Sequence, residues 1–332
     1  MKRVRIAQVG SGHDHAPMAF RTLLKNKDCF DLVGFAESTP GRTVPELYNA
    51  VPRYTVEELL EMQDLDAVAV ECEELNATVV AQRFADKGVG VYLDKPGSPD
   101  IAAFEHLMDT IEQKNLPFEM GYMYRYNPCV QNIFDMVRRG ELGDIYSVEA
   151  HMSVRHTNRK REWLGQFKGG MTFFLGCHLI DLVLQLQGGP LEIIPLNTST
   201  NIESVHTEDF GFVVFRYPNG VSFIKTCAAE PNGYIRRQFV VCGSKGTVEI
   251  KPFEKPEHDG LLSSPTTIAL VSDNPDHIWR DCAKPQELVI YDRYETILRR
   301  FAESVNGAPN PYSCSYERLL FRTLMKCCGI ES

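Results

Sequence analysis

A lysine in the stretch YLDKPG (residues 92–97) has the chemistry and the setting of a proton-transfer group. The apolar residues before it are typical of a buried strand, so Lys95 would stand where that strand ends. In an open parallel sheet, ligands bind outside the carboxyl ends of the strands. A lysine at this edge could take a proton from a substrate hydroxyl group. Asp94 and Pro96 would fix its direction; the alternative is an ordinary surface lysine in a turn.

A histidine in GGMTFFLGCHLID (residues 169–181) is a second proton-transfer candidate. His178 lies near the expected start of a helix, after a glycine-rich segment. Histidine is the side chain that most often exchanges protons near neutral pH. Asp181 follows one turn later, so the two side chains can share one helix face. The alternative is a buried histidine with a purely structural role.

The glycines of QVGSGHDHAPMAF (residues 8–20) predict a turn that can hold a phosphate group. Gly10, Ser11 and Gly12 follow an apolar strand-like run and precede a helical pattern. Glycines let the backbone approach a pyrophosphate, and the N-terminus of the next helix offers free N–H groups. Glu37 ends the next strand, where a carboxylate can bind an adenosine ribose and would repel a 2′-phosphate. This arrangement favours NAD over NADP; the alternative is a surface turn with a solvated acid.

The same stretch continues as His13-Asp14-His15, three side chains that can bind metal ions. At the start of a helix, residues two positions apart point to different sides, unlike the i, i+4 spacing that serves zinc. No remote fourth ligand is evident, so we expect no metal here. His13 and Asp14 are then expected on the phosphate side of the turn. His15 stands where a small residue usually permits close packing, so it either enters the helix–sheet contact or turns toward cofactor or substrate.

Apolar strands and helical patterns alternate through the first part of the chain. Near-continuous apolar strands between helices are typical of a parallel sheet covered on both faces. We therefore predict an α/β protein whose residues 1–123 form a doubly wound, Rossmann-type domain that binds NAD(P). Its expected strands are residues 3–9, 30–37, 65–72, 89–96 and 116–124.

The pattern changes after the helix expected at 128–140. Strand-like segments then follow one another on short turns such as YPNG (217–220) and GSKG (243–246), which favour hairpins. We therefore predict a second α/β domain, residues 124–332, with a mostly antiparallel sheet. A Pro- and Ser-rich stretch, 252–285, is expected to be an irregular loop. The expected strands are 145–155, 191–202, 208–217, 220–228, 236–243 and 246–251, and the later helices are 177–188, about 286–305 and 314–328.

Composition restricts the classes of partner. The chain has 332 residues, 43% of them hydrophobic and 24% charged, which is typical of a folded protein with a real core. Its formal net charge of −9 argues against nucleic-acid binding or an anionic membrane, which needs a basic face. No apolar run is long enough to span a bilayer, and MKRVRI leads into a strand without the apolar core of a signal peptide. The ten cysteines include no CxxC pair and lie mostly in apolar runs, so we expect free thiols in the cytoplasm.

Taken in order, these segments resemble the Gfo/Idh/MocA family, named for glucose–fructose oxidoreductase, inositol dehydrogenase and a rhizopine-catabolism protein. The resemblance extends over essentially the whole chain. DKP stands in place of the family's usual Glu-Lys-Pro, and GGMTFFLGCHLID resembles its glycine–histidine–aspartate signature. Further matching segments are YRYNP (124–128), GELGDIYSV (140–148), GSKGTVEI (243–250) and FAESVNGAPNP (301–311).

The resemblance implies a Rossmann domain followed by an α/β domain with an open, mostly antiparallel sheet. It implies NAD or NADP at the glycine turn, and a sugar, polyol or related alcohol between the domains. By position, Lys95 corresponds to the family's catalytic lysine and His178 to its catalytic histidine. Beyond the glycine turn and Glu37, the implied cofactor contacts are Glu71, Asn76, Asp94, Lys95, Pro96 and Arg125. The implied substrate contacts are Lys95, Tyr124, Arg155, His178, Asp181 and Tyr234.

One departure from the family pattern affects the acid–base chemistry. Phe174 stands where family dehydrogenases often carry an aspartate four residues before the histidine. The acid–base pair would then be Lys95 and His178, or would draw on another residue such as His151 or His156.

Two further departures lie near the expected cofactor. Asn76 stands in place of a family histidine, and ECEELN (71–76) adds three acids at the cofactor edge. His15 stands in place of the third glycine or alanine of the turn. These changes alter the surroundings of the cofactor, not the fold.

The predicted function is that of an NAD-dependent oxidoreductase that oxidises a secondary alcohol of a sugar, polyol or cyclitol by hydride transfer. One alternative is a redox-neutral NAD-dependent enzyme that cleaves glycosides or epimerises sugars. Another is a non-catalytic NAD-binding sensor or assembly subunit. The family resemblance also implies a homodimer or homotetramer, because the open sheet in this family often packs against another copy.

Overall fold

The strands and helices of the chain fall into two units. The computed structural model describes residues 2–276, 279 and 281–330; residues 1, 331 and 332 of the predicted domains lie outside the described residues. One unit consists of Met1–Met123 with Tyr294–Phe321, and the other of Tyr124–Arg293 with Arg322–Ser332. Each unit contains its own principal sheet.

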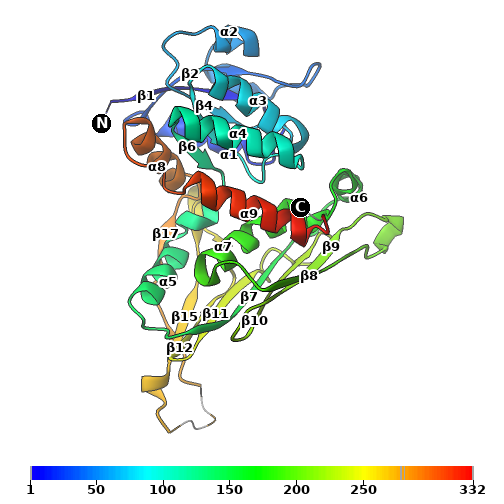
Figure 1. Cartoon of the computed structure of the whole chain (residues 1–332), viewed down its shortest axis with the longest axis vertical. Helices are drawn as coiled ribbons and strands as arrows, with labels where there is room; N and C mark the ends of the chain where they lie inside the picture. Colours follow the sequence, from blue (N-terminus) through cyan, green and yellow to red (C-terminus); the bar gives the residue numbers. More distant parts are fainter. Residues whose placement is uncertain (1, 277–278, 280, 331–332) are drawn as a thin grey trace. The chain divides into compact units, whose positions relative to one another are not determined.

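The first unit is built on a six-stranded sheet in which all neighbouring strands are parallel (Figure 1). The order β3-β2-β1-β4-β5-β6 is that of a doubly wound Rossmann-type fold, which confirms the predicted class. β4 and β5 are buried along their whole length, because helices cover both faces. The strands are β1 (Val4–Val9), β2 (Phe30–Ala36), β3 (Arg53–Tyr54), β4 (Ala67–Val70), β5 (Gly90–Leu93) and β6 (Phe118–Met120).

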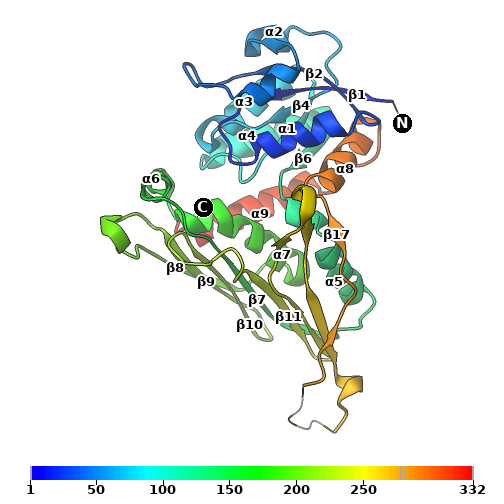
Figure 2. The same ribbon diagram turned by 180° about the vertical axis from the view of Figure 1, so that it is seen from behind.

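Helices of the first unit lie on both faces of this sheet. α3 (Glu74–Asp86) and α4 (Ile101–Lys114) cover one face (Figure 1), and α1 (Ala16–Lys25) covers the other (Figure 2). α1 carries a proline in its first turn, where the missing N–H would have no helical partner in any case. α2 (Val56–Leu60) begins with a capping box, and α8 (Glu295–Val305) packs on α1 and β6. Because all neighbouring strands are parallel, the turns that lead from strands into helices lie at one edge of the sheet.

The second unit contains an eight-stranded mixed sheet in the order β16-β15-β12-β11-β7-β10-β9-β8. Neighbouring strands are antiparallel except β7 and β10, which are parallel. The predicted hairpins at YPNG and GSKG join β9 to β10 and β11 to β12. The strands are β7 (Ile145–Ser153), β8 (Glu192–Thr198), β9 (Phe210–Arg216), β10 (Val221–Cys227), β11 (Gln238–Gly243), β12 (Gly246–Ile250), β15 (Thr266–Leu270) and β16 (Lys284–Pro285).

One face of the eight-stranded sheet is packed against helices. Residues of β9, β11 and β12 alternate between buried and partly exposed, as expected for strands with one covered face. α7 (Cys177–Gln187) packs on β7 and β10 after a π-helical turn, η4 (Thr172–Gly176). The other helices of this unit are α5 (Pro128–Arg138) and α6 (Asn158–Trp163), while the last helix, α9 (Cys314–Cys327), has its first residues in the first unit and its last in the second. No described helix combines the length and the apolarity that a transmembrane segment needs.

The stretch 252–285 is more ordered than predicted, and the expectation of an irregular loop was wrong in part. β15 pairs with β12, while β13 (Lys255–Pro256), β14 (Leu262–Ser263) and β17 (Ile290–Tyr291) form a small separate sheet. These strands are short and flanked by Pro and Ser, so periodicity gives little indication of them. Because β17 occupies the preceding residues, α8 begins at Glu295 rather than near 286. Residues 277, 278 and 280 of the stretch lie outside the described residues.

A buried ion pair ties α6 to the start of β9. Nε and Nη2 of Arg161 lie 2.9 and 2.7 Å from Oδ2 of Asp209, and the two side chains are 1% and 0% exposed. Arg161→Met should lower the free energy of unfolding by about 3–5 kcal/mol, because it leaves Asp209 as an uncompensated buried charge. Urea denaturation measures this change.

The matched control is Arg159→Met, which makes the same chemical change at an exposed position of α6. It should alter the free energy of unfolding by less than about 0.5 kcal/mol. Equal stability of the two variants would show that the buried pair is not a stabilising element.

Candidate functional site

The turn after β1 is packed too tightly against the end of β4 to carry side chains at its glycines. Gly10 has a φ of +90°, in the region that favours glycine. A Cβ on Gly10 would lie 2.8 Å from the Cα of Cys72, and a Cβ on Gly12 would lie 2.6 Å from the Cγ of Glu73. These glycines, predicted as a phosphate cradle, therefore also let the turn approach the loop after β4.

Two N–H groups of this turn point at protein acceptors. Ser11 donates to Oε2 of Glu37 from its backbone nitrogen at 3.2 Å and from its hydroxyl at 2.5 Å. The N–H of His13 donates to the carbonyl oxygen of Glu71 at 3.1 Å. A phosphate group at the turn would compete with Glu37 for the N–H of Ser11.

A cation stands beside the same turn. Arg42 forms an ion pair with Glu73, and its guanidinium lies near Gly12. Its Nε lies 4.0 Å from Oε1 of Glu37. An anionic ligand at the turn could recruit Arg42 from Glu73, since an arginine fork matches phosphate oxygens.

A cavity of about 430 Å³ opens at the carboxyl end of β2. Its lining combines apolar and polar side chains, among them Phe35, Glu37, Ser38, Val44, Tyr54 and Arg83. Ligand sites are usually concave, largely apolar, and provided with a few polar groups that fix orientation. The carboxylate of Glu37 at this cavity is therefore suitably placed to recognise a ribose.

Asp94, Lys95 and Pro96 lie just after β5 and are buried. Lys95 is 1% exposed and Asp94 3% exposed. Oδ1 of Asp94 accepts the N–H of Lys95 at 2.7 Å, which fixes the turn. Gly121 makes room for this carboxylate, because a Cβ there would lie 2.5 Å from Oδ1 of Asp94. The lysine side chain thus starts from a rigid part of the sheet edge.

Two histidines and further carboxylates surround Asp94. Nδ1 of His13 and Nδ1 of His15 lie 2.9 and 3.0 Å from Oδ2 of Asp94. Glu71 approaches Nδ1 of His13 at 3.9 Å, and Glu74 approaches its Nε2 at 3.6 Å. The expectation that no remote ligand would join these histidines was therefore wrong. Parallel strands bring β4 and β5 to the same edge as the turn, and this supplies those partners.

His15 turns toward the end of β5. Besides its contact with Asp94, its ring meets that of Tyr294 edge-on, with centroids 5.7 Å apart. Its side chain is 15% exposed. Of the two predicted positions, the structure favours the one directed at the sheet edge.

Burial and mutual interaction shift the pKa values of this cluster. Burial lowers the pKa of His13, but the carboxylate of Asp94 outweighs it and leaves that pKa raised. For His15 burial prevails over Asp94, and its pKa falls to about 4. Burial, and then Asp94, raise the pKa of Glu71 well above its usual range. Burial would raise the pKa of Asp94, yet His13 and His15 hold it well below its usual range.

In the second unit, His178 lies against a tyrosine that is fixed by a buried acid. The rings of His178 and Tyr124 meet edge-on with centroids 4.8 Å apart. The hydroxyl of Tyr124 donates to Oε2 of Glu254 at 2.7 Å, and its ring stacks on Phe253 at 5.0 Å. His178 itself is 1% exposed. Its ring is therefore held in one orientation by packing.

Three residues that the sequence analysis did not single out complete this group: Arg237, Glu254 and Arg293. Arg293 donates to both carboxylate oxygens of Glu254, at 2.8 and 2.6 Å. Arg237 donates to the hydroxyl of Tyr124 at 3.3 Å, and Tyr234 donates to Glu254 at 3.4 Å. Burial and the charge of Glu254 raise the pKa of Tyr124. No local pattern indicates these residues, because their partners are remote in the sequence.

Arg125 and Asp181, predicted as a cofactor contact and a substrate contact, pair with each other. Nε of Arg125 lies 3.0 Å from Oδ2 of Asp181, with side chains 0% and 1% exposed. Gln185 donates to the same oxygen at 3.0 Å. The pair fixes the segment after β6 to α7 within the second unit, and ligand contacts by either residue stay a prediction.

Three other predicted residues lie on the surface of their units. Arg155 is exposed and pairs with Glu203 at 3.3 Å. Asp14 is exposed in the turn after β1, and Asn76 is exposed in the first turn of α3. Asn76 and Glu71, both predicted as cofactor contacts, therefore differ in exposure, because Glu71 is fully buried.

The position of the family's aspartate is aromatic in character. Phe174 is 3% exposed and meets the ring of Trp163 at 5.5 Å. His156 lies beside it, with ring centroids 6.1 Å apart. His151, the other substitute considered, is bound to Glu230 at 3.2 Å. Aromatic packing of Phe174 therefore takes the place of the family's acid at this position, and His156 is the neighbouring polar ring.

Together these groups can support proton transfer and nucleotide binding. A buried lysine, a glycine turn and a carboxylate beside a cavity occupy one edge of a parallel sheet. In the second unit a histidine lies in a polar, aromatic environment suited to a hydroxylated ligand.

Comparison with known proteins finds a family model that matches part of the second unit. Residues 130–249 match the family model described as the GFO/IDH/MocA C-terminal domain. An uncharacterized oxidoreductase of Schizosaccharomyces pombe is 23% identical over 226 residues, which cover 66% of this chain and 61% of that protein. The match thus spans less than two thirds of that relative's own length.

Two solved structures share the fold over almost the whole chain. A putative NADPH-dependent oxidoreductase from Desulfitobacterium hafniense has a TM-score of 0.83 at 18% identity, covering 99% of this chain and 95% of that one. An aldose-aldose oxidoreductase from Caulobacter crescentus, solved with glycerol, has a TM-score of 0.81 at 18% identity, covering 99% and 98%. At this identity the likeness is one of fold. With the family match over residues 130–249 and the oxidoreductase relatives, it confirms the predicted resemblance of the chain to the Gfo/Idh/MocA oxidoreductases.

Proposed function

We propose that this protein is an NAD-dependent oxidoreductase that oxidises a secondary alcohol of a sugar, polyol or cyclitol by hydride transfer. The observation that carries this proposal is the buried Lys95 just after β5, on the sheet edge that also holds the glycine turn and Glu37. Parallel sheets bind ligands at this edge, so a base and a nucleotide cradle there can serve one reaction.

In this proposal the chain's own residues move the proton. Lys95 takes the proton of the substrate hydroxyl, and its positive charge then stabilises the developing alkoxide. His178 is the second proton-transfer group, and Tyr124 orients it. The nicotinamide, when bound, supplies the hydride acceptor.

The first unit fits a nicotinamide dinucleotide at several points. Gly10, Ser11 and Gly12 would hold the pyrophosphate, with Arg42 as a neighbouring cation. Glu37 and the cavity beside it would receive the adenosine. The buried Glu71, Asp94 and Pro96 lie behind the turn and would set its shape more than contact the ligand.

The names of related proteins support the reaction class. The choice between NAD and NADP depends on this chain's own residues. One structural relative is named an aldose-aldose oxidoreductase, and another is named NADPH-dependent. At the end of β2 this chain carries both an acid, Glu37, and a nearby arginine, Arg42. An acid there favours NAD, whereas an arginine can accommodate the 2′-phosphate of NADP.

NAD should bind at least about tenfold more tightly than NADP, because the carboxylate of Glu37 accepts ribose hydroxyl groups and repels a 2′-phosphate. Fluorescence titration of both cofactors measures this ratio. Glu37→Gln, which removes the charge and keeps the shape, should reduce the preference.

Glu46→Gln, at an exposed acid of the same unit, is the matched control and should leave the ratio unchanged. Tighter binding of NADP by the native protein would mean that Arg42, not Glu37, faces the ribose.

Lys95→Ala should lower kcat by about 10²–10⁴-fold if the lysine is the general base. Circular dichroism and NAD affinity establish that the variant is folded and still binds the cofactor. Lys87→Ala, on the surface of the same unit, should turn over normally. Near-normal turnover of Lys95→Ala would reject the role proposed for this lysine.

A panel of sugars, inositols and sugar acids with NAD, followed by NADH absorbance, tests the proposed reaction itself. At least one compound should produce NADH. Phe174 in place of the usual aspartate favours a redox-neutral enzyme as the second candidate, and product formed without NADH would select it. Tight NAD binding without turnover of any compound would select a sensor instead.

The homodimer or homotetramer implied by the resemblance has a corresponding surface. Ile194 and Leu196 of β8 are 42% and 54% exposed, and their cross-strand neighbours on β9 are Val214 and Phe212. Contiguous exposed apolar side chains mark interaction surfaces. We propose that this face of the sheet joins two copies of the chain; a cytoplasmic location remains part of the same proposal.

A further inference from the structure

We propose that His13, His15, Asp94 and Glu71 form a binding site for one divalent transition-metal ion at the carboxyl edge of the parallel sheet. This goes beyond the proposed reaction, and its test needs no turnover. The four residues come from the turn after β1 and from the ends of β4 and β5. A metal ion would join these three segments through one centre.

The ligand atoms are already close enough to share one ion. The candidate nitrogen and oxygen atoms of His13, His15 and Asp94 all lie within 4.8 Å of one another. Oδ2 of Asp94 is 2.9 and 3.0 Å from the two Nδ1 atoms. Ligands of a tetrahedral zinc ion stand about 3.3 Å apart, given metal–ligand distances of about 2.0–2.2 Å. Small side-chain rotations would therefore complete a coordination shell.

The hydrogen bonds of His13 leave the correct nitrogen for a metal. Its Nε2 lies 3.0 Å from the carbonyl oxygen of Lys95, which can only accept, so Nε2 carries the hydrogen. Nδ1, which lies 3.2 Å from the N–H of His15, is the nitrogen that faces Asp94, and a metal ion bound there would take the place of the hydrogen bond from His15. A histidine that ligates a metal typically donates its other ring N–H to a backbone carbonyl or carboxylate. His13 has this arrangement.

The contact of His13 with Asp94 needs a positive charge between the two groups. Nδ1 of His13 lies 2.9 Å from a carboxylate oxygen of Asp94. Only a proton or a metal ion between these atoms makes the contact attractive. The same holds for the carboxyl groups of Asp94 and Glu71. A proton or a metal ion must lie between them to make their contact attractive.

Glu71 is the independent sign of a missing partner. Its side chain is fully buried, and among the described residues no N–H or hydroxyl group donates a hydrogen bond to its carboxylate oxygens, which interact instead with the carboxyl group of Asp94. Its Oε2 lies 3.9 Å from Nδ1 of His13, on the side where the metal would sit. Burying a polar group without a hydrogen-bond partner costs free energy. We therefore expect this cluster to bind a ligand that supplies the partner.

The charge of the surroundings suits a divalent ion. Three carboxyl groups, of Asp94, Glu71 and Glu74, stand against one lysine, Lys95, in a region that is almost wholly buried. A divalent cation would balance carboxylates here, with both imidazoles neutral as metal ligands must be. Two imidazoles with two carboxylates suit Zn²⁺ or another first-row ion rather than Mg²⁺ or Ca²⁺.

Calorimetric titration of the chelator-treated protein with Zn²⁺ tests this site, and Co²⁺ as a second probe reports its ligands by visible absorption. We expect one ion per chain. His15→Ala and Glu71→Gln should each weaken Zn²⁺ binding by more than about tenfold, because even outer partners of metal sites cost 10–100-fold when removed. Circular dichroism verifies that each variant is folded.

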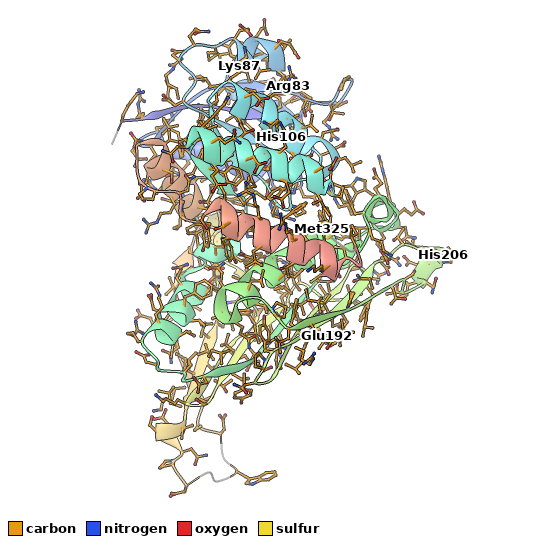
Figure 3. The ribbon with its side chains drawn as sticks, in the orientation of Figure 1. Arg83, Lys87, His106, Glu192, His206 and Met325 are labelled. Atoms are coloured by element: carbon orange, nitrogen blue, oxygen red, sulfur yellow. The ribbon has the colours of Figure 1, made fainter. Side chains whose placement is uncertain are left out.

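His106→Ala is the matched control, since His106 is an exposed histidine on α4 of the same unit (Figure 3). It should leave the affinity and the Co²⁺ spectrum unchanged. Zn²⁺ binding that survives both site variants would overturn the proposal, as would a folded native protein that binds neither ion. Protons alone would then neutralise the cluster.

Discussion

The contact of Asp94 with the imidazoles of His13 and His15 is the interaction on which the candidate site of the first unit depends. A carboxylate this deeply buried is tolerated only with charged or hydrogen-bonding partners. Asp94 obtains them from the turn after β1 and in return fixes the direction of Lys95 through its own backbone contact. These contacts therefore fix the glycine turn, the end of β5 and the candidate base Lys95 relative to one another. Gly121 and Gly10 carry no side chains, which would otherwise push these segments apart.

The second unit also contains a buried carboxylate that needs partners, that of Glu254. Glu254 is fully buried and is surrounded by Arg293, Tyr124 and Tyr234 rather than by histidines. Through Tyr124 it holds the ring of His178. In each unit a buried carboxylate thus fixes a neighbouring side chain that is a candidate for proton transfer. Such preorganisation is what a catalytic site requires, because groups that are already in place need no rearrangement during the reaction.

Local sequence patterns predict most of the fold and the parts of the site that follow strand ends. The apolar runs of β4 and β5 and the turns YPNG and GSKG indicate the two sheets, because burial and turn chemistry are encoded within a few residues. The strands in 252–285 escape this reasoning, since β15 acquires its hydrogen bonds from a remote neighbour. The same limit applies to the site. Asp94 and His15 are separated by 79 positions, and only the parallel order of the strands makes them neighbours. Glu254 and Arg237 are likewise defined by tertiary contacts alone.

The central claim is that the turn after β1 receives a nicotinamide dinucleotide. Hydrogen–deuterium exchange of the protein with and without saturating NAD tests it most directly. The account predicts slower exchange of the amides of residues 10–16, together with the segment after β2 that contains Glu37. Saturating NAD that leaves exchange in both segments unchanged would contradict the account.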